Sequence, residues 1–170
     1  MLAISLAIAL ESKGEIIFKQ RRVGRDGKLF TIYKFRTMYQ SAPSYSYKPE
    51  NGHDSRITRV GRLLRKTSLD ELPQLVNVLK GDMSLVGPRP EMPFIVNLYE
   101  PWQHQRHNVL PGITGYWQVF ARSLGPMHEH GEYDVYYVKH QSALLDITLI
   151  DPDRLLGPDD KRRHLTRIDA

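Results

Sequence analysis

Two segments rich in glycine and proline limit the fold most strongly, because neither of them can continue a helix or a strand. They are Val86–Pro90, which reads Val-Gly-Pro-Arg-Pro, and Leu110–Gly115, which reads Leu-Pro-Gly-Ile-Thr-Gly. Proline fixes its φ angle and lacks an N–H donor, and glycine is the residue most suited to tight turns. We therefore expect a rigid loop at the first segment and a turn-rich loop at the second. The 170 residues are enough for one domain of ordinary size, assembled from short elements around these loops.

A β-hairpin is expected near the N-terminus. The apolar runs Ile16–Phe18 and Leu29–Tyr33 are rich in strand-forming residues. Between them lies Arg25–Lys28, whose Asp-Gly pair is a strong turn signal. Residues 40–53 carry Ser, Pro, Tyr, Asn and Gly without periodicity and are expected to form a loop.

Helices are expected over most of the remaining chain. A basic helix is predicted from Arg56 to Lys66, where the apolar residues fall at helical spacing. A second helix follows it and repeats apolar residues at i, i+3, i+4 and i+7: Leu72, Leu75, Val76 and Leu79.

The start of this second helix carries two opposing signals. Ser68 and Glu71 fit a capping box, and Gly81 suits the helix end. Pro73 would remove a hydrogen bond just beyond the first turn, which shifts the expected start by a residue or two.

Further helices are expected over residues 93–105 and 133–150, and a disordered polar tail over 151–170. The predicted class is therefore α+β, mostly helical with a small β-hairpin.

Residues 1–10 form an apolar run at the N-terminus, Met-Leu-Ala-Ile-Ser-Leu-Ala-Ile-Ala-Leu. A transmembrane helix needs about 20 apolar residues, so this run is too short to span a bilayer. Ala7-Ile8-Ala9 resembles a signal-peptide cleavage site, but no Lys or Arg precedes the run. A buried first helix or a shallow membrane anchor is the favoured interpretation.

The net charge of +5 indicates an anionic partner, which leaves nucleic acid, a phosphate-bearing substrate and an acidic membrane surface open. The chain has no cysteine, which excludes disulfides, thiolate metal sites and a cysteine nucleophile. Cations gather in two regions, residues 13–36 and residues 53–66. A solvated positive face would explain them, but the interspersed glycines and prolines favour phosphate binding, for which Arg is well suited.

Asp70 and Glu71 open the second predicted helix and are flanked by cations, namely Arg62, Arg65, Lys66 and Arg89. Acidic first-turn residues are common in helices, so a purely structural role remains open beside a chemical one. His104 and His107 could share a helix face, but no third zinc ligand is evident.

Four blocks of the sequence resemble one known family, the bacterial sugar transferases. These monotopic phosphoglycosyl transferases start exopolysaccharide, O-antigen and glycoprotein glycan assembly. The blocks are Phe18-Lys-Gln-Arg-Arg-Val-Gly24, Tyr33-Lys-Phe-Arg-Thr-Met38, the ungapped stretch Asp54–Pro90, and Leu110–Val119 with Arg122. The resemblance covers roughly residues 5–150.

The resemblance implies a two-step reaction through a covalent intermediate. Asp70 would attack the sugar-proximal phosphorus of a UDP-sugar and release UMP, and polyprenyl phosphate would then take the phosphosugar. Glu71 would position the metal or the acceptor phosphate, and Asp70 and Glu71 would bind Mg²⁺, with Mn²⁺ as a substitute. The implied phosphate and substrate ligands are Lys34, Arg65, Arg89 and Arg122.

The resemblance also implies a monotopic catalytic domain at the cytoplasmic face of the bacterial inner membrane. Its parts would be a remnant of a membrane-inserting re-entrant helix (1–12), the catalytic domain (13–150) and the tail (151–170). The partners would be a UDP-sugar, polyprenyl phosphate and the membrane surface, without nucleic acid and with a homo-oligomer left open.

Two rival hypotheses are a basic nucleic-acid-binding module and a catalytically impaired homologue that acts as a scaffold or partner protein. The long third block argues against the first. The intact Asp70-Glu71 pair argues against the second.

Overall fold

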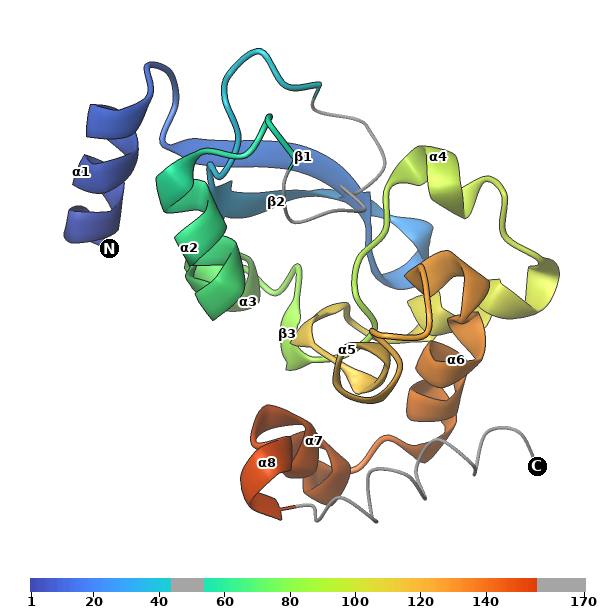
Figure 1. The fold of residues 1–170 in the computed structure, drawn as a ribbon. Helices are drawn as coiled ribbons and strands as arrows, with labels where there is room; N and C mark the ends of the chain where they lie inside the picture. The colour runs from blue at the N-terminus through green and yellow to red at the C-terminus, as the bar shows by residue number, and fades with distance from the viewer. Residues whose placement is uncertain (44–53, 156–170) are drawn as a thin grey trace. The chain divides into compact units, whose positions relative to one another are not determined.

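The computed structural model describes residues 1–43 and 54–155, and about half of them are helical (Figure 1). Two small two-stranded sheets complete the mixed α+β fold, which confirms the expected α+β class, although the helical share is about half and a second sheet accompanies the expected hairpin. The chain divides into two compact units. Unit 1 comprises Met1–Arg21 and Thr31–Asn77, and unit 2 comprises Arg22–Phe30 and the chain from Val78 onward. This division runs through the region that sequence analysis assigned to a single domain.

The expected hairpin is present, with strands β1 (Ile17–Val23) and β2 (Leu29–Phe35) paired in one sheet. A 3₁₀ turn, η1 (Arg25–Gly27), joins them. Asp26 and Gly27 both have positive φ angles, 56° and 72°, which is the conformation that an Asp-Gly pair favours. The turn prediction is therefore confirmed.

Helices α1 (Leu2–Glu11) and α2 (Arg59–Thr67) belong to unit 1. The expected basic helix begins at Arg59, because the Thr58 side chain accepts a hydrogen bond from the Gly61 N–H and so caps the helix. Ile8 of α1, Phe35 of β2 and Leu64 of α2 form a small buried core. The N-terminal apolar run thus forms a helix, and one side of this helix packs against the core of unit 1.

The segment after α2 differs from the predicted single α-helix. It forms a 3₁₀ helix, η2 (Leu69–Gln74), followed by the short helix α3 (Leu75–Leu79). Pro73 lies inside η2 and cannot donate the hydrogen bond that an α-helix would need there. The predicted capping box is wrong, because Ser68 is left-handed (φ 57°) and makes no side-chain cap. Gly81 has the positive φ angle (77°) expected near the helix end.

In unit 2, strands β3 (Ser84–Val86) and β4 (Gly112–Thr114) pair in parallel, with Ser84 opposite Gly112. The expectation of a loop is confirmed for Gly87–Pro90, but it is wrong for Val86 and for Gly112–Thr114, which lie in the two strands. Glycines permit the pairing, because a Cβ atom at Gly112 or Gly115 would overlap the backbone of Gly87.

The remaining elements of unit 2 are helical and pack around a core that includes Tyr116, Tyr137 and Leu149. The helix expected over residues 93–105 is interrupted before Pro101, and that over 133–150 is interrupted at Ser142. The elements are α4 (Pro93–Val96), η3 (Pro101–Asn108), α5 (Tyr116–Phe120), η4 (Met127–Glu129), α6 (Gly131–His140), α7 (Ala143–Ile150) and α8 (Pro152–Leu155).

Two expectations fall partly outside the described residues. The tail predicted from residue 151 begins with α8, and its residues 156–170 lie outside the described part. The loop predicted over 40–53 is described only to residue 43. In the described ranges, no helix combines the length and the apolar character needed to cross a membrane.

Candidate active site

Asp70 and Glu71 lie together in η2, directly after the left-handed turn at Ser68. The turn ends α2 and starts η2, so both carboxylates stand beside the last turn of the basic helix. Asp70 is buried, with 9% of its surface exposed. A carboxylate at this depth needs polar or cationic neighbours to stay ionised.

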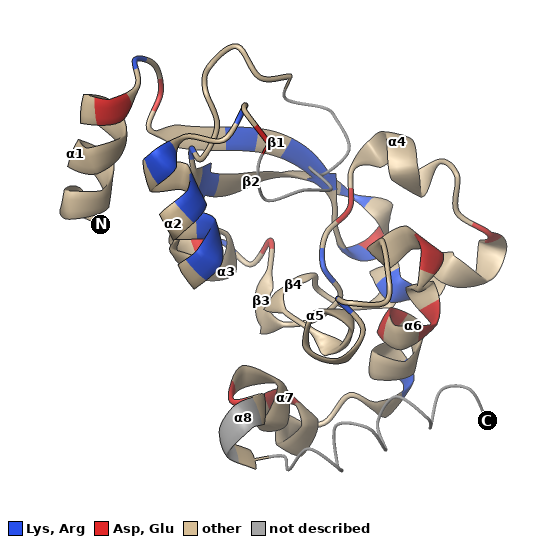
Figure 2. Ribbon diagram, viewed as in Figure 1, with Lys and Arg blue, Asp and Glu red and all other residues tan. Residues whose placement is uncertain are grey.

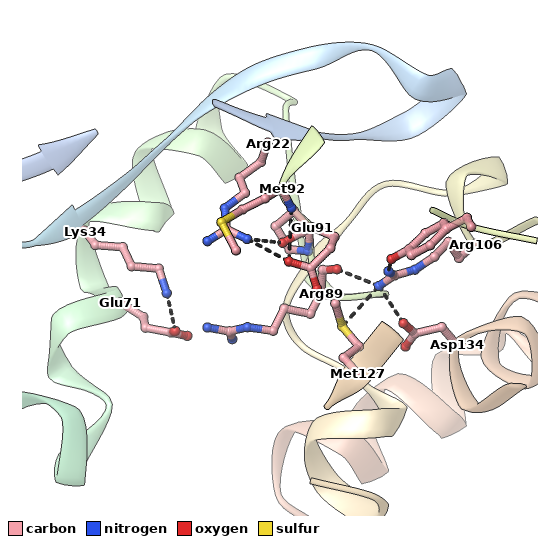
Figure 3. A network of polar contacts seen from close by, with 11 residues as sticks. Arg22, Lys34, Glu71, Arg89, Glu91, Met92, Arg106, Met127 and Asp134 are labelled. Carbon is pink, nitrogen blue, oxygen red and sulfur yellow. Dashed lines mark hydrogen bonds and ion pairs between the residues drawn. The ribbon is translucent and has the colours of Figure 1, made fainter. Parts of the chain in front are cut away.

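Lys34 of β2 reaches Glu71 from the hairpin, as Figure 3 shows. Its Nζ donates to Glu71 Oε1 at 2.7 Å, and both side chains are 16% exposed. A short, largely desolvated contact of this kind is stronger than a surface ion pair. The structure therefore brings together two of the predicted site residues, which lie far apart in the sequence.

Arg65, in the last turn of α2, is a cation whose charge interacts with that of Asp70. Burial lowers the pKa of Arg65, while the charges of Asp70 and Asp54 oppose this effect. Arg65 stays charged, since a guanidinium does not lose its proton in proteins. Its Nε donates to the Thr37 hydroxyl at 2.8 Å.

Asn77 is a structural residue of the site that the sequence analysis missed. Its buried amide accepts from the Tyr33 N–H at 3.2 Å and donates to the Thr31 carbonyl at 2.7 Å. These two bonds attach the middle of α3 to β2, the strand that carries Lys34. No sequence signal marks an asparagine for this role.

Arg36 was counted among the cations of the 13–36 cluster, but its guanidinium is directed to the backbone. It is buried and donates to the carbonyls of Ser12 and Lys13, at 2.7 and 2.6 Å. Figure 2 shows Lys and Arg along β1, β2 and α2. Arg36 follows β2 directly, and its guanidinium stabilises the fold by binding backbone carbonyls.

In unit 2, the Pro-Arg-Pro segment is held by two other arginines. Arg22 Nη1 donates to the Pro90 carbonyl and to Glu91 Oε1, at 3.2 and 3.1 Å. Arg106 Nη2 donates to the carbonyl of Arg89 at 2.6 Å (Figure 3). The backbone around the predicted phosphate ligand Arg89 is therefore fixed from both sides.

Arg106 itself belongs to a buried ion pair that the sequence analysis missed. Its Nη2 lies 2.6 Å from Asp134 Oδ2, and the two side chains are 2% and 0% exposed. Met127 Sδ accepts from Nη2 at 3.2 Å, and the Tyr99 hydroxyl accepts from Nη1. Burial raises the pKa of Asp134, and the charge of Arg106 opposes that rise.

The remaining sequence candidates also lie in unit 2. Arg122 is exposed in the turn that follows α5. His104 and His107 pack with Tyr99 as an aromatic cluster, the His107 and Tyr99 rings being stacked. Burial, Arg106 and His104 lower the pKa of His107 to about 4, so this imidazole is neutral at neutral pH.

The donors that the sequence predicts for a metal ion are Asp70 and Glu71, which are adjacent in η2, and Glu71 Oε1 also accepts from Lys34. Within residues 1–43 and 54–155, no group of three His, Asp or Glu side chains could hold an ion alone. Mg²⁺ is commonly bound through one or two carboxylates together with substrate phosphates and water. The donor set therefore fits an ion shared with a bound pyrophosphate.

Comparison with known proteins gives a consistent result. A family model described as bacterial sugar transferase matches residues 1–151. The chain is 44% identical over 156 residues to a UDP-N-acetylgalactosamine-undecaprenyl-phosphate N-acetylgalactosaminephosphotransferase from Aeromonas hydrophila. It is 46% identical over 144 residues to the uncharacterized sugar transferase EpsL of Bacillus subtilis. It is 40% identical over 155 residues to a UDP-glucose:undecaprenyl-phosphate glucose-1-phosphate transferase of Escherichia coli.

These matches cover most of this chain but differing shares of the relatives. The matched share of this chain is 88% for the Aeromonas protein, 84% for the Bacillus protein and 86% for the Escherichia protein. The matched share of those proteins is 37%, 70% and 33%, respectively. The chain thus spans about a third of the length of two of the three.

Proposed function

The chain belongs to the bacterial sugar transferase family, and from this membership we propose that it transfers a sugar-1-phosphate from a UDP-sugar to undecaprenyl phosphate. The product would start the assembly of a polysaccharide such as exopolysaccharide, O-antigen or capsule. The names of the Aeromonas and Escherichia relatives describe transferases that act with undecaprenyl phosphate. The sugar differs between those two names, so the sugar of this chain is left to experiment.

Asp70 is the proposed nucleophile. One of its carboxylate oxygens forms a bond to the phosphorus next to the sugar, and the bond from that phosphorus to the bridging oxygen breaks. UMP leaves with the electron pair, and the phosphosugar stays on Asp70. An oxygen of undecaprenyl phosphate then attacks the same phosphorus and restores the carboxylate.

Charge neutralisation is the main physical requirement of this reaction, since a carboxylate and a pyrophosphate repel each other. The observation that carries the proposal is the ion pair between Lys34 and Glu71 in unit 1, next to Asp70 in the chain, with the charge of Arg65 acting on Asp70. Arg65 favours the ionised form of Asp70, and Lys34 fixes the orientation of Glu71. Asp70 and Glu71 would hold Mg²⁺ or Mn²⁺, which supplies further positive charge against the pyrophosphate.

Arg89 and Arg122 are proposed as phosphate and nucleotide ligands from unit 2. Arg89 is supported by the backbone anchors at Pro90 and at its own carbonyl, which limit its movement. The proposed catalytic domain of residues 13–150 takes residues from both units.

We further propose a monotopic location at the cytoplasmic face of the inner membrane. Leu2, Leu6 and Leu10 of α1 are 88%, 61% and 79% exposed, which is a large apolar face to leave in water. Insertion of this face into one leaflet would bring unit 1 close to the phosphate of the acceptor lipid. In this proposal, residues 1–12 are the membrane-associating part of the chain.

The test combines nucleotide release with detection of the covalent intermediate. Purified membrane fraction is incubated with a panel of UDP-sugars and Mg²⁺, UMP is measured, and the intact protein is weighed by mass spectrometry. Asp70→Asn should abolish both UMP release and the phosphosugar adduct, because an amide is a poor nucleophile. Glu71→Gln should slow turnover severely, and EDTA should stop it.

Asp26→Asn is the matched control, since Asp26 is 59% exposed at the hairpin turn and Asn also accepts a positive φ angle. An Asp70→Asn protein that still formed the adduct would refute the assignment. No UMP from any UDP-sugar with the unaltered chain would instead support the catalytically impaired scaffold.

A further inference from the structure

Thr37 lies where α2 meets the end of β2, and three groups of the α2 segment contact it. The Thr58 N–H donates to the Thr37 carbonyl at 3.1 Å. Gly61 packs so closely that a Cβ atom there would overlap the Thr37 backbone. Arg65 Nε donates to the Thr37 hydroxyl at 2.8 Å. The three residues lie on one face of the helix, at successive turns.

These contacts separate two functions of Thr37. The carbonyl and the backbone surface fix the position of α2, and they are present with any side chain. Among the contacts described above, the Thr37 hydroxyl takes part in one, the hydrogen bond from Arg65 Nε. Removing the hydroxyl therefore leaves the docking of α2 in place and changes the orientation of one guanidinium.

The geometry of a guanidinium gives this bond a chemical consequence. Arg has two edges that can bind an anion with two parallel hydrogen bonds, and one edge includes Nε. Because the Thr37 hydroxyl accepts from Nε, the Nη1–Nη2 edge is the one that can receive a phosphate. Thr37 is buried (7% exposed), and its backbone carbonyl is bonded to the Thr58 N–H, so its hydroxyl is a rigid acceptor.

We propose that Thr37 is a positioning residue that aims the Nη1–Nη2 edge of Arg65 at the phosphate of the substrate beside Asp70. This role rests on the proposed transferase function. Arg65 contacts the substrate, and Thr37 acts through Arg65 without contacting the substrate itself. Because Thr37 holds the Arg65 guanidinium in place before the reaction, the guanidinium does not have to be ordered in the transition state. Loss of the Thr37 hydroxyl should therefore lower kcat more than it changes KM.

The decisive variants are Thr37→Val, which replaces the hydroxyl by a methyl group of similar size, and Thr37→Ser, which keeps it. Thr67→Val is the matched control, because within the described ranges the Thr67 hydroxyl bonds only to carbonyls of its own helix, those of Leu63 and Leu64. UMP release by Thr37→Val should fall about tenfold in kcat with little change in KM, as expected for loss of one charge-assisted hydrogen bond. Thr37→Ser and Thr67→Val should stay near the unaltered chain.

A double-variant cycle with Arg65→Lys tests whether Thr37 acts through Arg65. Lysine keeps the charge but has no Nε–H fork, so Thr37→Val should cause no further loss in the Arg65→Lys background. Additive losses would overturn the proposal, as would equal losses in Thr37→Ser and Thr37→Val, which would indicate side-chain packing.

A second measurement does not depend on turnover. In ¹⁵N NMR spectra, the Arg65 Nε–H should exchange slowly with solvent, and Thr37→Val should accelerate this exchange. Unchanged exchange in Thr37→Val would overturn the proposal even if the enzyme were active. If this acceleration occurs while the unaltered chain releases no UMP, the positioning role stands and the proposed function fails.

Discussion

The carboxylate of Glu11 lies 2.9 Å from the backbone nitrogen of Val60, and its other oxygen lies 2.6 Å from that of Arg59. The last residue of α1 thus satisfies two N–H groups at the start of α2. Helix α2 carries Arg65 at its other end, so the apolar helix α1 and the candidate site are joined through one element. The negative charge also suits the positive end of the α2 dipole.

The first prediction concerns this cap. Partial burial alone would raise the pKa of Glu11, but the N–H donors of Val60 and Arg59 outweigh it and hold the pKa below 4.5. The stabilisation of the folded state by the Glu11 carboxylate is therefore complete above about pH 4.5. It is lost as the pH falls through the lowered pKa of Glu11. Glu11→Gln should cost about 1 kcal/mol at pH 7.

Urea unfolding followed by circular dichroism checks this value, and amide exchange at Arg59 and Val60 reports the cap directly. The difference between the two proteins should shrink below pH 4.5. A difference that stays constant down to pH 3 would contradict the charged cap.

The second prediction concerns the apolar face of α1. Changing Leu2, Leu6 and Leu10 together to Gln should weaken flotation with anionic vesicles by about tenfold or more, because each buried leucine contributes about 1.5–3 kcal/mol. Substitution is a cleaner test than deletion of residues 1–12, since Ile8 and Glu11 also stabilise unit 1. Leu98→Gln, at a leucine that is 70% exposed in unit 2, is the control. Equal flotation of all three proteins would exclude α1 as the anchor.

The third prediction concerns the partner of Glu71. Lys34→Met should reduce UMP release more than tenfold and destabilise the protein by about 1–3 kcal/mol, because a largely buried carboxylate loses a charge-assisted hydrogen bond. Lys34→Arg should retain most of the stability. Lys28→Met is the control on the same hairpin, where the lysine side chain is 83% exposed. Turnover assays and thermal unfolding of the four proteins make the comparison; normal turnover in Lys34→Met would remove Lys34 from the site.

The fourth prediction concerns the buried pair in unit 2. Asp134→Leu should destabilise unit 2 by about 3–5 kcal/mol, because the Arg106 charge is left buried without its partner. The double variant with Arg106→Met and Asp134→Leu should lose less unfolding free energy than Asp134→Leu alone. Both tryptophans, Trp102 and Trp117, lie in unit 2, so fluorescence-detected urea unfolding reports this unit.

Glu132→Gln, at a residue two positions before Asp134 in α6 and 38% exposed on its side chain, should change stability by less than about 0.5 kcal/mol. If the double variant loses as much unfolding free energy as Arg106→Met and Asp134→Leu lose together, Arg106 and Asp134 are not coupled.

Local sequence determined the elements whose signals lie within a few residues. The Asp26-Gly27 pair produced the hairpin turn, because both residues accept positive φ angles. Thr58 caps the basic helix. Pro73 predicted a later start for the next helix, and the structure has a 3₁₀ segment around this proline. In each case the interaction that decides the conformation is made within one turn of the chain.

The sequence also pointed to Asp70 and Glu71, through the motif that contains them, but it could not sort the cations around them. Lys34 and Arg36 lie two residues apart in one basic cluster. Tertiary structure pairs Lys34 with Glu71, 37 residues away, and directs Arg36 to backbone carbonyls at the end of α1. Periodicity and charge counts describe a residue's own segment, whereas a salt bridge depends on which segment packs against it.

The same reason explains the residues that were missed. Asn77 bonds to Thr31, 46 residues away, and both Arg65–Thr37 and Arg106–Asp134 span 28 residues. The parallel pairing of β3 with β4 likewise depends on glycines that let two distant backbones approach. A buried polar side chain needs hydrogen-bond donors or acceptors around it, and these groups become its neighbours only when the chain has folded.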